Sequence, residues 1–231
     1  MVKKLKEEII ILIPAYNPDK ELIKLVKELT ENYKIIVIND GSDSKKYFNA
    51  IKKDCKILEH SVNKGKGRAL KTGFRYIIEN YHNAIGVVTI DADGQHDIQD
   101  IYKICEVFKQ QSDILIFGKR NFDSKEIPFR SRIGNKMISR LIEKKTRKNI
   151  GDTQTGLRAI PIKYLKDFER IYGERFEYET NVLLYCIKQK INIHEIAIKS
   201  IYKNKNKMSH FRMLRDSMII YNQLRKKLRG K

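Results

Sequence analysis

The chain has 231 residues, of which 41% are hydrophobic and 33% charged, and this composition predicts a globular protein with a full apolar core. No apolar run is long enough for a secretion signal or a membrane-spanning helix. The three scattered cysteines indicate reduced thiols in a cytoplasmic protein rather than disulfides or a zinc site. The net charge is +20, and residues 119–148 (net +8) and 199–231 (net +10) supply nearly all of it. The clustering favours partners with phosphate groups over a merely lysine-rich background.

Apolar strands alternate with amphipathic helices through the first half of the chain. We expect strands at 9–13, 35–38, 56–59, 85–90 and 114–117, with helices between them. Asn17 is expected to cap the first helix, with Pro18 at its first position. This alternation predicts an α/β fold, a doubly wound and mostly parallel sheet with helices on both faces.

The second half of the chain is less regular. We expect a basic amphipathic helix at about 131–145, with Ile133, Met137, Ile138 and Leu141 on one face. A polar turn at 151–158, a helix at 177–190 and a half-buried strand at 191–198 follow. The sequence predicts one domain over residues 1–198 and a basic amphipathic helical tail over 199–231. Such a helix suits the surface of an anionic membrane, although it would also pack on the domain.

Polar clusters follow four of the strands, at 14–17, 39–42, 91–96 and 118–121. Ligands of such sheets bind beyond the carboxyl ends of the strands, so we expect these clusters to share one crevice. In the third cluster Asp91 and Asp93 approach one cation if Gly94 bends the chain, and Gln95 is a plausible neutral ligand. Such oxygen ligands suit Mg²⁺ or Mn²⁺. His96 is as well suited to donate a hydrogen bond to a ligand.

The loop at 63–68 has unhindered backbone N–H groups and two cationic side chains at a helix start, which suits a phosphate or a nucleotide. It has neither the spacing of the phosphate-binding loop of NTPases nor the dinucleotide fingerprint. Asp40 has two interpretations: it accepts hydrogen bonds from a nucleotide base, or it stabilises the turn before Gly41.

These motifs, with Asp152, Thr155, Gly156, Leu157 and Arg158 after them, resemble glycosyltransferase family 2, and most closely its polyprenyl- and dolichyl-phosphate branch. The resemblance covers residues 9 to about 160 and implies a GT-A domain over 1–198, a nucleotide-diphospho-sugar donor and inversion at the anomeric carbon. It implies a metal at Asp93 and Gln95 with Asp91 nearby. The donor contacts expected on the same basis are Pro14, Ala15, Tyr16, Asn17, Asp40, Asn63, Lys66, Gly67, Asp91 and Ala92.

The acceptor is expected at the basic residues beyond the fifth strand. A lipid phosphate is already ionised and needs no general base, and Arg120 with Arg130 or Arg132 would hold it. Arg158 either contacts phosphate as well or forms a buried structural salt bridge. If the acceptor is a sugar hydroxyl, Asp152 is the candidate base. We expect the catalytic residues among Asp93, Arg120, Arg132 and Asp152.

Family members often carry C-terminal transmembrane helices, and this sequence has no such segment. We therefore expect a peripheral protein at the inner face of the membrane, either alone or with a separate integral-membrane partner. Three other functions share features with this sequence: sugar transfer to a glycan hydroxyl, nucleotidyl transfer and nucleic-acid binding. The sequence lacks the Gly-rich loop that a nucleotidyltransferase carries after its first strand. No nucleic-acid partner is expected.

Overall fold

The computed structural model describes residues 8–121, 129–146 and 150–199. The predictions for the side chains of Arg130, Arg132 and Leu141, and for residues 200–231 of the expected tail, lie outside the described residues. Within the described residues the strands are β1 (Glu8–Ala15), β2 (Lys34–Asp40), β3 (Lys56–His60), β4 (Ala84–Thr89), β5 (Leu115–Arg120), β6 (Arg158–Pro161) and β7 (Ile193–Ile198). The helices are α1 (Lys20–Leu29), α2 (Lys46–Ile51), α3 (Lys66–Asn80), α4 (Ile98–Gln110), α5 (Phe129–Thr146), α6 (Ile162–Arg170) and α7 (Glu177–Lys188).

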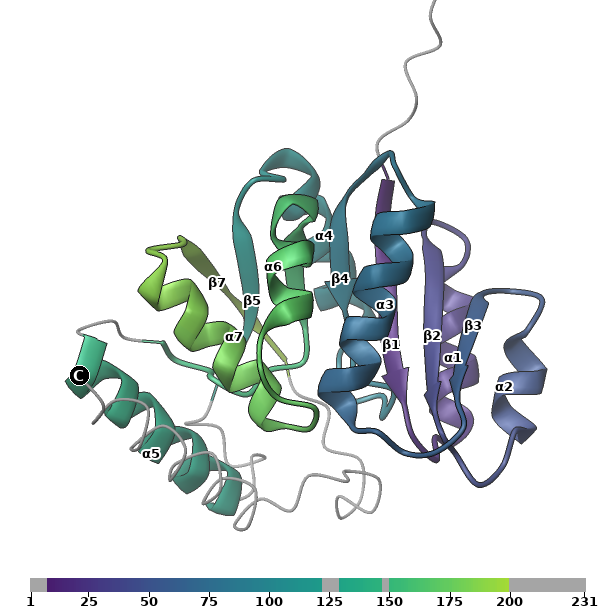
Figure 1. Ribbon diagram of the computed structural model, residues 1–231, viewed down its shortest axis with the longest axis horizontal. Helices are drawn as coiled ribbons and strands as arrows, with labels where there is room; N and C mark the ends of the chain where they lie inside the picture. Colours follow the sequence, from purple (N-terminus) through teal and green to yellow (C-terminus); the bar gives the residue numbers. More distant parts are fainter. Residues whose placement is uncertain (1–7, 122–128, 147–149, 200–231) are drawn as a thin grey trace, which may run out of the picture.

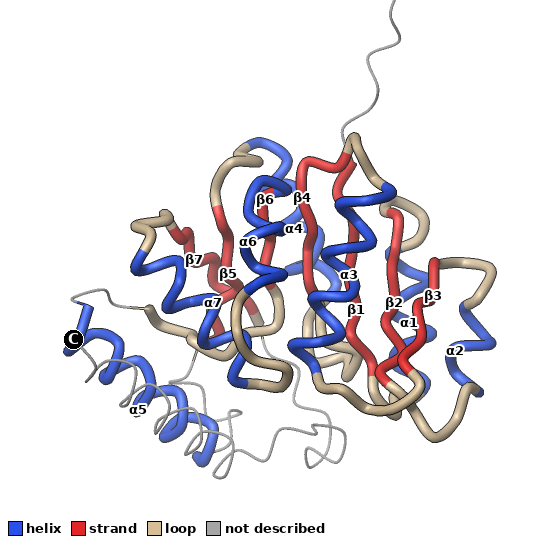
Figure 2. The backbone as a smooth tube through the Cα atoms, in the orientation of Figure 1, coloured by secondary structure: helices blue, strands red, loops and turns tan. Residues whose placement is uncertain are grey.

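The strands form one sheet in the order β3-β2-β1-β4-β6-β5-β7 (Figure 1). Neighbouring strands are parallel except at β6, which is antiparallel to both β4 and β5. Helices cover both faces, and Figure 2 shows the strands as a layer between them. The predicted doubly wound, mostly parallel α/β fold is therefore confirmed.

Two apolar cores, one on each face, hold the sheet in place. The side chains of β1 alternate between them, with Ile10 and Leu12 in the core under α3, α6 and α7. Ile9, Ile11 and Ile13 lie in the core under α1, α2 and α4. Burying one such side chain contributes roughly 1.5–3 kcal/mol, so a strand that is apolar on both faces belongs in the middle of the sheet.

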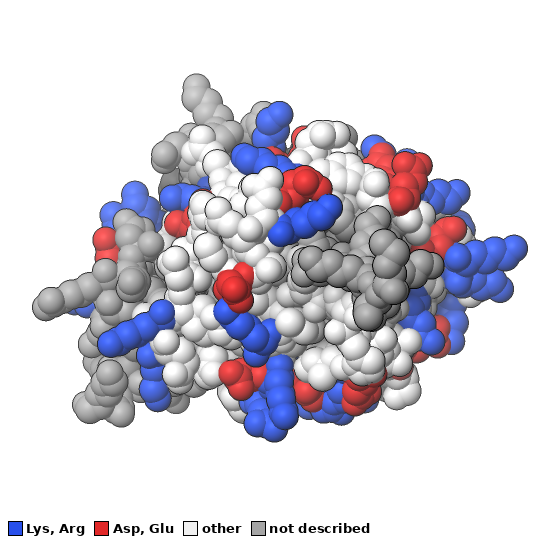
Figure 3. Space-filling model, turned by 90° about the horizontal axis from the view of Figure 1, so that it is seen from above, with Lys and Arg blue, Asp and Glu red and all other residues white. Residues whose placement is uncertain are grey.

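The carboxyl ends of β1 and β2 lie at the lower edge of the view in Figure 1, where α3 and α7 also begin. The opposite edge is seen in Figure 3, where the Lys and Arg side chains of the described residues are interspersed with Asp and Glu. That face shows no broad patch of one sign among the described residues. No described helix combines the length and the apolarity needed to cross a membrane.

Two local predictions were wrong, and two elements were not predicted. Asp19, not Asn17, caps α1, because its side chain accepts a hydrogen bond from the N–H of Glu21 at 2.8 Å. Ile133 is 47% exposed on α5, whereas Ile138 and Ile142 are fully buried. The strand β6, which begins at the last residue of the predicted turn at 151–158, and the helix α6 after it were not predicted.

Candidate active site

Asp91 lies just beyond the end of β4, with protein groups close to both of its carboxylate oxygens. The ammonium group of Lys66, the first residue of α3, lies 2.6 Å from Oδ1 of Asp91 and 2.9 Å from Oε2 of Glu179 on α7. On the other side, a Cβ placed on Gly156 would lie 2.2 Å from Oδ2 of Asp91. Only glycine therefore allows the turn at 151–158 to approach Asp91 so closely.

The surroundings shift the pKa values of the two carboxylates of the Asp-x-Asp motif in opposite directions. Burial opposes ionisation of Asp91, but Lys66 and then His96 keep the pKa of its carboxyl well below the usual range. Burial and, after it, the neighbouring Asp91 raise the pKa of Asp93. Gly94 has φ +67° and turns the chain so that the N–H of Gln95 donates to Oδ1 of Asp93 at 3.1 Å. The predicted bend of the chain at Gly94 is therefore present.

The residues around Asp93 fit a divalent cation. Asp91, Asp93 and Glu179 carry three negative charges against the single positive charge of Lys66, so the cluster has a net charge of −2. Asp93 is also partly exposed and therefore accessible. The described residues contain no group of three or more His, Cys, Asp and Glu placed to hold a metal. A metal here would use carboxylates, the amide of Gln95 and oxygens from outside the protein, which is the chemistry of Mg²⁺ and Mn²⁺.

His96 lies beside this cluster, and its Nε2 has no hydrogen-bond partner among the residues that the structure describes. Its side chain is 8% exposed, and Nε2 is 3.7 Å from Oδ2 of Asp91, too far for a hydrogen bond. A buried polar atom of this kind needs a partner. His96 is therefore placed to donate to Asp91, or to a group bound next to it, after a small movement.

The loop at 63–68 is not the open phosphate cradle that the sequence suggested. The N–H groups of Lys64 and Gly65 donate to the carboxylate of Asp40 at 2.9 and 2.8 Å. The N–H of Arg68 donates to the carbonyl of Glu174 at 3.0 Å. A Cβ on Gly65 would lie 2.4 Å from the same carbonyl oxygen. The glycines make room for the segment before α7, so the prediction of unhindered backbone donors was wrong.

Several predicted donor residues of this loop and of β2 serve the protein itself. Asp40 is 3% exposed and also lies 2.6 Å from Nδ1 of His60, which supports its role in stabilising the turn. Asn63 accepts a hydrogen bond from Arg175 at 3.2 Å, and Gly67 is buried against Tyr178. Of the loop residues predicted to bind the donor, Lys66 is the one whose charge reaches the carboxylates.

The ends of β1 and β2 come together as predicted. Pro14 and Ala15 belong to β1 and pair with Ile38 and Asn39 of β2. Asn17 has φ +45°, and its amide exchanges two hydrogen bonds with Asp43, at 2.7 and 2.9 Å. These bonds fix the two strand ends side by side. The remaining predicted donor residues, Tyr16 and Ala92, are partly exposed at the same edge of the sheet.

Arg120, at the end of β5, is held by Asp152. The carboxylate of Asp152 is fully buried and accepts from Nε, Nη2 and the N–H of Arg120 at 2.6, 2.9 and 3.2 Å. It also accepts from the N–H of Gln154 at 3.1 Å. Glu195 of β7 anchors the segment, because its carboxylate accepts from the N–H groups of Gly151 and Asp152. The prediction of Asp152 as a general base was therefore wrong: it orients Arg120 instead.

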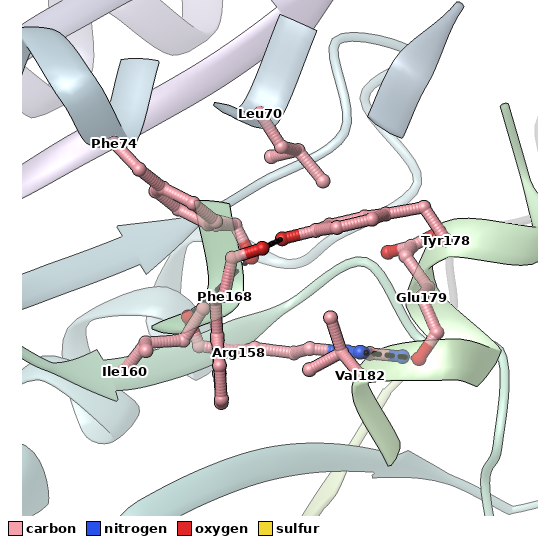
Figure 4. A pocket seen from close by; sticks show the side chains of 9 residues that line it. Leu70, Phe74, Arg158, Ile160, Phe168, Tyr178, Glu179 and Val182 are labelled. Carbon is pink, nitrogen blue, oxygen red and sulfur yellow. Dashed lines mark hydrogen bonds between the residues drawn. The ribbon is translucent and has the colours of Figure 1, made fainter. Parts of the chain in front are cut away.

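Arg158 is a structural residue and not a phosphate ligand. It is 3% exposed, and its guanidinium donates to the carbonyls of Thr155, Glu179 and Thr153 at 2.9, 3.1 and 3.5 Å. The guanidinium also stacks 4.3 Å from the ring centre of Phe117. The expected alternative was right in giving Arg158 a buried structural role and wrong in the partner, because Arg158 donates to carbonyl groups and not to a carboxylate. Figure 4 shows Arg158 beneath a small void lined by Leu70, Phe74, Thr89, Ile160, Phe168, Tyr178, Glu179 and Val182.

Sequence reasoning missed Glu179. It lies in the first turn of α7, where Tyr178, Glu179, Thr180 and Asn181 are all buried. The sequence did hold a sign of this role: Glu179, Thr180 and Asn181 are consecutive polar residues in a predicted helix. Buried polar groups need partners, so such a run indicates a functional or structural contact.

Comparisons with known proteins bear on the family of this chain. The model of the family "Glycosyl transferase family 2" matches residues 10–168. A UDP-N-acetylglucosamine–dolichyl-phosphate N-acetylglucosaminyltransferase of Methanococcus voltae is 32% identical over 84% of this chain and 86% of its own. A dolichyl-phosphate β-glucosyltransferase of Saccharomyces cerevisiae is 25% identical over 91% of this chain and 73% of its own.

A solved structure supports the fold. Glucosyl-3-phosphoglycerate synthase of Mycobacterium tuberculosis, in complex with Mn²⁺, uridine diphosphate and phosphoglyceric acid, superimposes with a TM-score of 0.70. The match covers 97% of this chain and 78% of that one at 16% identity, so it bears on architecture alone. The family match covers more than half of the sequence and includes the Asp-x-Asp motif. The chain therefore belongs to glycosyl transferase family 2 and is a glycosyltransferase with the GT-A fold.

Proposed function

We propose that the protein transfers a sugar from a nucleotide-diphospho-sugar to a polyprenyl phosphate, with inversion at the anomeric carbon and with Mg²⁺ or Mn²⁺ as cofactor. The observation that carries the proposal is the cluster of Asp91, Asp93 and Lys66 at the carboxyl edge of the sheet. It occurs in a chain that is 32% identical to a transferase whose name specifies a UDP-sugar and dolichyl phosphate.

The donor's diphosphate would lie beside Asp93. Asp93 and Gln95, with Asp91 nearby, would hold the metal. The metal would act as a Lewis acid and neutralise the charge of the leaving diphosphate. The ammonium of Lys66, already paired with Asp91, adds a fixed positive charge at the same place. The joined ends of β1 and β2 around Asn17 would take the nucleoside. Uridine is the first base to test because the Methanococcus voltae enzyme uses it by name, with guanosine as the alternative.

The acceptor phosphate would bind at Arg120, with help from Arg130 or Arg132. Asp152 fixes the plane of the Arg120 guanidinium through Nε and Nη2, and a guanidinium held in one orientation presents its positive charge to a phosphate in a fixed direction. A phosphate oxygen is ionised at neutral pH and attacks without a base. A glycan hydroxyl would need one, and Asp152 is fully buried and bonded to Arg120. This supports the lipid phosphate as acceptor over the hydroxyl.

A polyprenyl phosphate presents its charged group at the membrane surface. The basic segment 199–231, with net charge +10, is suited to hold the enzyme at the inner face of an anionic membrane, alone or beside an integral-membrane partner.

A transfer assay tests the proposal. The purified chain is incubated with radiolabelled UDP- or GDP-sugars, polyprenyl phosphate in detergent and MnCl₂ or MgCl₂, and the organic extract is counted. We expect labelled lipid that disappears with EDTA and falls at least about 100-fold in Asp93→Asn, because the metal loses a charged ligand. Asp97→Asn is the matched control, since Asp97 caps α4 and asparagine caps equally well.

Each part of the proposal has its own contrary result. EDTA-insensitive transfer would exclude the metal, and label that enters only a glycan hydroxyl acceptor would exclude the lipid phosphate. Equal use of every nucleotide sugar would contradict a nucleoside site at Asn17.

A further inference from the structure

One lysine joins three segments that are far apart in the sequence. Lys66 lies at the start of α3, Asp91 after β4 and Glu179 in the first turn of α7. The side chains of Lys66 and Glu179 are 15% and 9% exposed, so water screens their interaction weakly. Glu179 lies outside residues 10–168, the part of the chain that the family model matches.

The protein builds α7 firmly onto α3 at this point. The side chain of Glu174 accepts from Arg68 and Lys71, and its carbonyl accepts from the N–H of Arg68. A Cβ on Gly67 would lie 2.6 Å from Cβ of Tyr178, so the two helix starts are in direct contact. The position of Glu179 relative to Lys66 is therefore fixed by packing and does not depend on the ion pair alone.

The ion pairs divide the charge of Lys66 between two carboxylates. A cation that binds at Asp91 faces the ammonium of Lys66, which is 2.6 Å from that carboxylate, and is repelled by it. Glu179 offsets this repulsion because it lies 2.9 Å from the same ammonium. It also offers Lys66 a second partner when Asp91 is engaged elsewhere.

We propose that Glu179 is a positioning residue of the active site: it holds Lys66 beside the Asp-x-Asp carboxylates and tunes the affinity of these carboxylates for a divalent cation. This inference rests on the proposed metal-dependent function. Glu179 touches neither sugar nor phosphate and acts through Lys66. Lys66 and the divalent cation compete for Asp91, and Glu179 shifts that competition towards the cation.

The inference predicts opposite effects for the two partners. Lys66→Met removes the competing charge, so the chain should bind Mn²⁺ about three- to tenfold more tightly without nucleotide. In Glu179→Gln the ammonium of Lys66 has Asp91 as its one charged partner among the described residues. This variant should therefore bind Mn²⁺ about three- to tenfold more weakly. A purely structural role would make both variants worse.

Binding is measured by titrating the full chain with MnCl₂ and following the free Mn²⁺ signal by electron paramagnetic resonance, with the melting temperature as a folding check. Glu177→Gln is the matched control: it changes the net charge equally, two residues away on the same helix. Glu177 accepts from the N–H groups of Glu174 and Arg175, so Mn²⁺ affinity should change less than about twofold.

The outcomes separate this inference from the proposed function. Opposite shifts for Lys66→Met and Glu179→Gln, with Glu177→Gln close to the wild type, are the expected result. The inference would be overturned if the wild type binds Mn²⁺ and Glu179→Gln binds it with the same affinity, or if the affinity shifts in the same direction in both variants. Either result would leave the proposed metal site intact. A wild-type chain that binds no Mn²⁺ in the millimolar range would overturn both.

Discussion

Gly156→Ala adds one methyl group where the turn at 151–158 meets Asp91. The new Cβ would lie 2.2 Å from Oδ2 of Asp91, whereas ordinary contacts begin at 3.4 Å. The backbone of Gly156 has no positive φ, so the substitution causes crowding without backbone strain. The Asp91 carboxylate must therefore move by about 1 Å, and movement on this scale in an active site can reduce the rate roughly 100-fold.

The substitution should leave the chain folded while it lowers the rate. Inserting a methyl group into a packed region costs about 1–3 kcal/mol. We expect kcat/KM for lipid-linked product to fall about 30- to 100-fold, while the chain stays folded and melts at a moderately lower temperature. The displaced Asp91 carboxylate also changes its distance from the ammonium of Lys66, so the Mn²⁺ affinity should change in the same variant.

Gly151→Ala is the control from the same turn. Its Cβ would lie 2.1 Å from Cε of Lys119, but that side chain is 47% exposed and can swing away. Activity should stay within about twofold of the wild type, because a flexible surface side chain yields at little cost. Wild-type kcat/KM and Mn²⁺ affinity in Gly156→Ala would refute the assignment of Asp91 to the reacting site.

Three further predictions follow from the buried polar groups. Asp152→Asn should raise the KM for polyprenyl phosphate about tenfold and leave the KM for the donor nearly unchanged, since it loosens Arg120; equal changes in both would contradict this. Arg158→Met should lower the unfolding free energy by about 2–4 kcal/mol, because it leaves three carbonyl groups without their donor; denaturant unfolding would measure this, and a change below about 1 kcal/mol would contradict it. Burial raises the pKa of the thiols of Cys55, Cys105 and Cys186 to about 12. A thiol reagent should therefore react slowly with the native chain from pH 8 to 10 and quickly after unfolding. Rapid reaction of the native chain would contradict this, because it would show an accessible thiolate.

The sheet and its functional edge were predictable because they depend on local patterns. Runs such as residues 9–13 and 35–38 are apolar on both faces, and such strands are stable only inside a sheet covered by helices. The direction of parallel strands then places polar clusters such as residues 91–96 at one edge. Asp91, Asp93 and Gln95 follow the end of one such strand, so their place at this edge could be predicted from the sequence.

The roles of individual polar residues depended on contacts that local patterns do not encode. Gly65 and Gly67 were interpreted as a phosphate cradle, but they make room for a segment more than a hundred residues further along the chain. The short strand β6 was missed because its four residues begin with a charged arginine. Arg158 is buried there only because carbonyls of the turn and of α7 satisfy it.

The sequence by itself thus determined the fold class, the carboxyl edge and the pair of acidic residues, since periodicity and strand direction are properties of neighbouring residues. Tertiary structure decided which charges meet. Asp152 became the support of Arg120, and Glu179 became the partner of Lys66, because burial allows a charge only beside an opposite charge or a hydrogen-bonding group. Those partners come from distant segments, and packing alone brings them together.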